Sequence, residues 1–172
     1  MEANDLIEIN GKHYLLTQKA NYKGANYFVA VEIVDGKMIH KYGTFREDIA
    51  KDGTVYMNLV EDPNILTEVY KLFIEDLYKD IENDPNYLEP GQIVTMGDDR
   101  DYVLLDYIPY LQDIYSVFIT IDAPINMIVA KRNANNKLVD MSDTQEGVDV
   151  LRIYGLVHSG AVDINKLNSD KQ

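Results

Sequence analysis

The chain has 172 residues, 46% of them hydrophobic and none of them cysteine, which excludes a disulfide framework, a thiolate zinc site and a cysteine nucleophile. This length suits one large domain or two small ones. The formal net charge of −13 opposes direct binding to nucleic acid or an anionic membrane, since both would repel it, and favours a basic protein partner or simple solubility. Because no apolar run approaches the ~20 residues that span a bilayer, and because the acidic start lacks a signal-peptide pattern, we expect a cytoplasmic protein.

The first half of the chain predicts an antiparallel meander followed by a helix. The pairs Asn10-Gly11 and Asp35-Gly36 indicate tight hairpin turns, because these residues accept positive φ angles. The strands expected around them are rich in β-branched and aromatic residues and cover 6–9, 13–18, 26–34, 37–42 and 54–60. The polar stretch Gly43–Gly53 is expected to be mainly loop. Asp62 suits a helix cap and Pro63 the first helical position, and apolar residues then recur at helical spacing up to Ile81.

The second half repeats this order of elements. Strands are expected at 92–96, 102–108, 114–121, 125–131 and 137–141. A weaker helix is expected from about Asp143 to Val157, with an interruption at Gly155. The residues from about 168 onward are expected to form a flexible tail.

Self-similarity in the sequence indicates a tandem duplication. At a shift of 88 positions Tyr14 coincides with Tyr102 and Tyr27 with Tyr115, whereas at a shift of 81 Asp62 coincides with Asp143. The second copy is therefore seven residues shorter, and the deletion is expected between Ile33 and Tyr56. The predicted fold class is α+β: two tandem repeats, residues 1–86 and 87–172, each an antiparallel β-meander closed by a C-terminal helix.

Three short segments of copy one carry a family resemblance. They are Asn10-Gly11-Lys12-His13-Tyr14, the run Tyr22 to Val29 (YKGANYFV), and Val60-Glu61-Asp62 leading into the helix. This pattern resembles the small acidic bacterial proteins grouped as domain of unknown function 1292, and related phage-type proteins. The resemblance is best over residues 6–75 and faint in copy two, which lacks the Asn-Gly and Tyr-Lys-Gly motifs. It implies a β-rich cytosolic domain, and no catalytic residues are carried over from it.

The residues capable of chemistry do not form a recognisable active site. The three histidines, His13, His40 and His158, are not placed together by the meander, so a histidine zinc site is disfavoured. No nucleophile elbow or phosphate-binding loop is present. The carboxylates of Asp98-Asp99-Arg100-Asp101 keep one alternative open, a divalent-metal-dependent enzyme or metal-binding protein, although a solvated turn is favoured there. We expect no cofactor and no enzymatic activity.

The acidic residues are unevenly distributed. Between Glu61 and Asp106 there are 13 acidic residues against three basic ones. Carboxylates mixed with tyrosines favour a recognition surface that steers a basic partner, against the alternative of a solvated helix face. The predicted partner-binding residues are Glu68, Glu75, Asp76, Tyr78, Asp80, Glu82, Asp84, Tyr87, Asp98, Asp99 and Asp101.

These patterns favour a non-enzymatic acidic protein-interaction module. One concrete version is an inhibitor from a phage or mobile element that acts on a basic nucleic-acid-binding or defence protein. A third class, a structural dimerisation module that forms homodimers, stays open.

Overall fold

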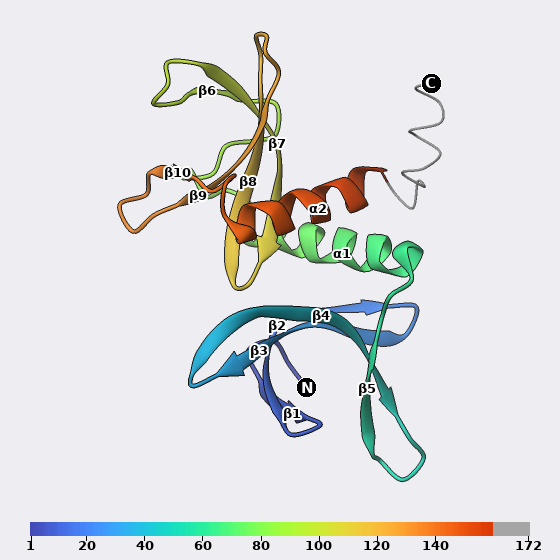
Figure 1. Ribbon diagram of the computed structural model, residues 1–172. Coiled ribbons are helices and arrows are strands. Elements are labelled where there is room, and N and C mark those ends of the chain that lie inside the picture. Colours follow the sequence, from blue (N-terminus) through green and yellow to red (C-terminus); the bar gives the residue numbers. More distant parts are fainter. Residues whose placement is uncertain (160–172) are drawn as a thin grey trace, which may run out of the picture. The chain divides into compact units, whose positions relative to one another are not determined.

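The computed structural model describes residues 1–159. Its contacts divide the chain into two compact units (Figure 1). One unit holds Met1–Phe73 together with the end of the last helix from Gly155, and the other holds Ile74–Tyr154. The predicted tail from residue 168 lies outside the described residues.

Each unit contains one five-stranded antiparallel sheet in which the strands pair in chain order. The sheet of the first unit consists of β1 (Leu6–Ile9), β2 (Lys12–Tyr22), β3 (Ala25–Val34), β4 (Lys37–Ile49) and β5 (Val55–Leu59). The sheet of the second unit consists of β6 (Ile93–Thr95), β7 (Asp101–Tyr110), β8 (Asp113–Thr120), β9 (Met127–Arg132) and β10 (Leu138–Asp140). Helix α1 (Pro63–Ile81) follows the first sheet and helix α2 (Gln145–Ser159) follows the second. The predicted α+β class with two meander-and-helix repeats is confirmed.

The strand registers show the repeat directly. In the β2–β3 hairpin Leu16 pairs with Ala30, and a β-bulge follows immediately. In the β7–β8 hairpin Leu104 pairs with Phe118, and a bulge again follows immediately. Both pairs are offset by 88 positions, which is the shift found in the sequence. A bulge inserts one residue into a ladder at a defined place, so its recurrence at equivalent positions is a strong sign of common ancestry.

The seven-residue difference between the copies arises in two steps. The partner of Tyr27 on β4 is Arg46, and the partner of Tyr115 on β9 is Lys131, so the offset there is 85. In the next ladder the N–H of Val60 donates to the carbonyl of Thr44, and the N–H of Met141 donates to the carbonyl of Val129. Val60 and Met141 are therefore equivalent, and their offset is 81. Three residues are thus lost between β3 and β4 and four between β4 and β5.

Two local predictions were wrong. The polar stretch Gly43–Gly53 is mostly strand, because Gly43 to Arg46 pairs with β3 and Phe45 to Ile49 pairs with β5. Ladder hydrogen bonds on both sides outweigh the low strand propensity of its polar residues. In α2, Gly155 does not interrupt the helix, which continues to Ser159.

The helix signals at Asp62 and Pro63 are confirmed. Asp62 caps α1, since its carboxylate accepts a hydrogen bond from the backbone N–H of Asn64 at 2.9 Å. The cap of α2 is Thr144, one residue after the repeat counterpart of Asp62, and its hydroxyl accepts a hydrogen bond from the N–H of Gly147 at 3.1 Å.

The C-terminal half of α1 packs on the second sheet. Leu77 and Ile81 are buried in one cluster with residues of β7, β8 and β9. The first sheet has its own buried cluster around Leu16, Phe28 and Ala30. The contact boundary therefore falls inside α1, between Phe73 and Ile74, whereas the predicted boundary at residue 86 follows the repeat.

Two glycines of α2 give a matched test of how closely the start of this helix packs against the chain before it. A Cβ added at Gly147 would lie 2.0 Å from the Met141 carbonyl oxygen, whereas one added at Gly155 would meet nothing within 4 Å. We expect Gly147→Ala to destabilise the protein by about 1–3 kcal/mol, the range for overpacking, and Gly155→Ala to stabilise it by up to about 1 kcal/mol through helix propensity. Urea unfolding followed by circular dichroism measures both. Equal effects of the two variants would contradict the close contact between Gly147 and the Met141 carbonyl.

Candidate functional site

The end of α1 is fixed by a sharp turn of the backbone. Asn83 adopts a positive φ of 66°, as is common for the residue that follows a helix. The N–H of Asp84 donates to the carbonyl of Ile81 at 3.0 Å, and the N–H of Tyr87 donates to the carbonyl of Asp84 at 3.2 Å. These bonds turn the chain away from the helix axis and begin a linker, residues 83–92, that leads to β6.

The far end of the linker is a turn that belongs to the repeat. The N–H of Glu89 donates to the Gln92 side chain at 2.8 Å, and in copy one the N–H of Glu2 donates to the Asp5 side chain at 2.7 Å. The N–H of Gly91 then bonds to β7 at 2.8 Å. The linker is therefore anchored at both ends, by the helix and by the sheet.

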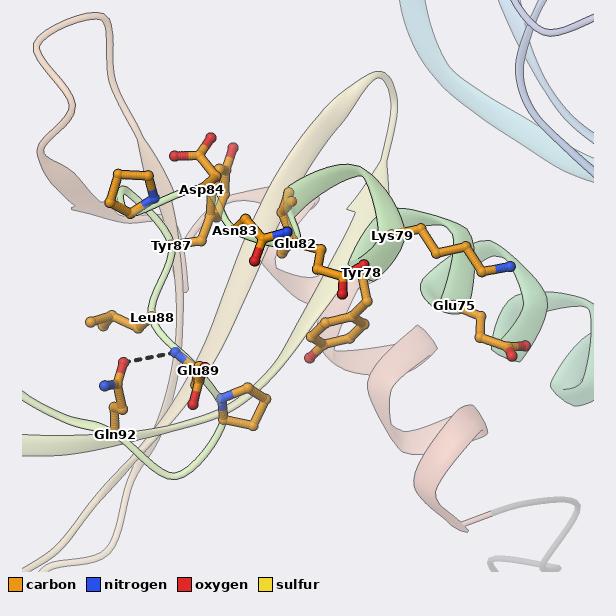
Figure 2. A pocket seen from close by; sticks show the side chains of 13 residues that line it. Glu75, Tyr78, Lys79, Glu82, Asn83, Asp84, Tyr87, Leu88, Glu89 and Gln92 are labelled. Atoms are coloured by element: carbon orange, nitrogen blue, oxygen red, sulfur yellow. Dashed lines mark hydrogen bonds between the residues drawn. The ribbon is translucent and has the colours of Figure 1, made fainter.

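A groove of about 990 Å³ lies between the end of α1 and this linker. Figure 2 shows its helix side, with Glu75, Tyr78 and Lys79, and its linker side, with Leu88 and Glu89. All its lining residues belong to the second unit: Glu75, Tyr78, Lys79, Ile81, Glu82, Asn83, Asp84, Pro85, Tyr87, Leu88, Glu89, Pro90 and Gln92. Four of them are acidic and one is basic, so the groove carries a negative potential.

Three tyrosines hold the two sides of the groove together. The ring of Tyr107 lies edge-on to Tyr78 at 6.0 Å between centroids and edge-on to Tyr87 at 5.6 Å. The Tyr107 hydroxyl donates to the carbonyl of Leu88 at 2.8 Å. Such edge-to-face contacts add about 0.5–1.5 kcal/mol each beyond the area they bury. The groove is therefore preformed on a packed aromatic support.

A buried carboxylate lies next to this support. Tyr78 donates its hydroxyl proton to Asp106, and the N–H of Tyr107 donates to the same carboxylate at 2.9 Å. Burial, and then the hydrogen bond to Asp106, raise the pKa of Tyr78 well above its usual value. Asp106 directly follows the β7 bulge, and its repeat counterpart is Gln18. Neither Asp106 nor Tyr107 was predicted, because their roles depend on a bulge that no sequence pattern marks.

The structure brings five of the eleven predicted partner-binding residues together in the groove: Glu75, Tyr78, Glu82, Asp84 and Tyr87. It does not bring the other six into the groove. Glu68, Asp76 and Asp80 are exposed elsewhere on α1, Asp98 and Asp99 are exposed in the turn before β7, and Asp101 is exposed at its first position. Sequence reasoning missed the linker residues Leu88 and Glu89 and the basic Lys79. The pattern Pro85 to Pro90 could have marked the linker as a stiff segment.

The aspartates of the turn before β7 accept hydrogen bonds from their own chain. Asp98 accepts from the Tyr102 hydroxyl at 2.6 Å, and Asp101 accepts from the Thr95 hydroxyl at 2.6 Å. The first of these bonds, followed by one from the N–H of Arg100, lowers the pKa of Asp98. In residues 1–159 no group of three or more His, Asp or Glu side chains is arranged to hold a metal ion.

Comparisons place no known protein beside this chain: no family model, no curated protein and no solved structure matches it. The fold and the groove define its class as a two-repeat α+β protein with an acidic groove at the end of its first helix. Within the described residues, no helix is both long and apolar enough to cross a bilayer.

The buried tyrosines predict a loss of stability at alkaline pH. Burial raises the pKa of Tyr115 from 10.0 to about 12 and also raises that of Tyr78. A tyrosine with a higher pKa in the folded state contributes its full stability below about pH 10 and loses it as the pH rises toward the folded value. We expect the free energy of unfolding to fall between about pH 10 and 12, and to fall less steeply in Tyr78→Phe.

Urea unfolding at a series of pH values measures this slope. The matched control is Tyr56→Phe, because Tyr56 is exposed, and it should retain the wild-type slope. An unchanged slope in Tyr78→Phe would contradict the described environment of Tyr78.

Proposed function

We propose that this chain is a non-enzymatic protein-interaction module whose acidic groove captures a basic segment of a partner protein. One concrete version is an inhibitor from a phage or mobile element that acts on a basic nucleic-acid-binding or defence protein. The resemblance of copy one to the domain of unknown function 1292 family stays a prediction beside this proposal.

The observation that carries the proposal is a preformed groove with carboxylates that the chain itself leaves available. Within the described residues, Glu75 and Glu82 are exposed and take part in no hydrogen bond or ion pair. The C-terminal end of α1 adds the negative end of its helix dipole to the same place. A cationic side chain that enters the groove would meet these charges beside the rings of Tyr78 and Tyr87.

The tyrosines support binding as well as shape. Tyr is enriched in the buried centre of protein interfaces, because a rigid ring supplies contact area at a low entropic cost. Tyr78 and Tyr87 are half-buried, so each presents part of its ring while the rest is held against Tyr107. An arginine fits best, since its planar guanidinium group both pairs with carboxylates and stacks on aromatic faces.

Charge reversal inside and outside the groove tests the proposal. The probe is a fluorescein-labelled arginine-rich peptide, and its binding to the full chain is followed by fluorescence anisotropy at low and moderate salt. We expect Glu75→Lys with Glu82→Lys to weaken binding by about 100-fold or more, because each reversal places a like charge beside the bound cation.

The matched control changes the same net charge on the same helix. Glu68→Lys with Asp80→Lys alters two exposed carboxylates that neither line the groove nor pair with a residue that lines it, and it should weaken binding by less than about tenfold at moderate salt. Equal losses for the two double variants would show that the peptide responds only to net charge, and the groove proposal would then be wrong.

A further inference from the structure

Within the part of the chain that the structure describes, the outer edge of β5 is open. Among residues 1–159, β5 pairs only with β4. The strand reads Val-Tyr-Met-Asn-Leu and contains no charged residue and no proline. Val55, Tyr56 and Leu59 are 45%, 54% and 56% exposed. Natural sheets usually blunt such an edge with charges, prolines or short length, because an open apolar edge recruits another strand.

The hydrogen-bond pattern shows which backbone groups face outward. The N–H of Ala50 bonds to the carbonyl of Thr54, and the N–H of Val60 bonds to the carbonyl of Thr44, both at 2.8 Å. In an antiparallel pair the hydrogen-bonded residues alternate, so the even-numbered residues of β5 bond to β4. The N–H and C=O groups of Val55, Met57 and Leu59 therefore point to the open side.

The second copy lacks this feature at the equivalent edge. Its edge strand, β10, has only three residues, Leu138–Asp140. At the offset of 81 residues, Asp140 stands where Leu59 does and Lys137 where Tyr56 does. The edge strand of copy two, β10, is thus short and charged, whereas the edge strand of copy one, β5, is longer and apolar.

We propose that β5 pairs antiparallel with β5 of a second copy of this chain, about a two-fold axis at Met57. In this register Val55 lies opposite the second copy's Leu59, so the outward backbone groups of the two strands satisfy one another and their apolar side chains meet. An antiparallel edge is self-complementary under two-fold symmetry, which is the commonest symmetry of protein dimers. The pairing joins the two sheets into one.

The uncharged sequence of β5 suits a second copy of this acidic chain as the occupant. The chain carries −13 overall, and two copies repel one another, but β5 itself is uncharged. The same register places Asp52 opposite Asp62 of the second copy, so like charges flank both ends of the paired strands and add to this repulsion. We therefore expect dimerisation to strengthen as salt screens the net repulsion.

Sedimentation velocity of the full chain from about 1 µM to about 1 mM tests the pairing, since weak dimers fall in this range. We expect a concentration-dependent dimer that Val55→Lys with Leu59→Lys weakens by about 100-fold or more. The matched control is Leu6→Lys, on the opposite edge strand, where Leu6 is 70% exposed; it should leave the dimer intact. A monomer at every concentration, or a dimer that the β5 variant does not weaken, would overturn the proposal.

Amide hydrogen exchange of the unaltered protein gives a second readout that does not depend on how a variant folds. At high concentration the amides of Val55, Met57 and Leu59 should become protected, whereas those of Tyr56 and Asn58 should be protected at low concentration too. Dimerisation without this alternating pattern would place the interface elsewhere and overturn the proposal.

Discussion

The burial of Leu77 and Ile81 against the second sheet is the contact on which the candidate site depends. It fixes the orientation of the last turns of α1, and with it the side of the helix that faces water. Glu75 and Glu82 are exposed as a consequence, and the chain that leaves the helix must turn back across the same sheet to reach β6. The groove is the space left between these two segments, so it is a product of packing and needs no flexible loop to form.

The turns and the first helix could be predicted because their signals are local. Asn10-Gly11 and Asp35-Gly36 do adopt positive φ at both residues, and Asp62 does cap α1. The features that were missed depend on partners distant in sequence. The strand from Gly43 to Ile49 exists because β3 and β5 flank it. Tyr70 lies among acidic residues in the sequence, yet it is buried, because its place on the helix turns it inward.

The candidate site could be predicted only in part, because only some of its features depend on local sequence. Helical spacing is enough to place Glu75, Tyr78 and Glu82 near one another, and composition marks the acidic stretch. What composition cannot show is which carboxylates the protein already uses. Asp98 and Asp101 belong to the densest acidic cluster of the sequence, but both accept hydrogen bonds from neighbouring hydroxyls. Net charge alone therefore overestimates the surface that is available to a partner.

The groove and the open edge lie in different units of the chain, the groove within Ile74–Tyr154 and β5 within Met1–Phe73. The turn at Glu2–Asp5 recurs at Glu89–Gln92, but in copy two it follows a helix, and the groove forms between them. Copy two also has a shorter edge strand that carries Asp140, whereas copy one has Leu59 there. Charge on an edge strand opposes unwanted strand pairing. The apolar, uncharged edge of β5 lacks this protection, and the pairing proposed for it rests on that difference between the two edges.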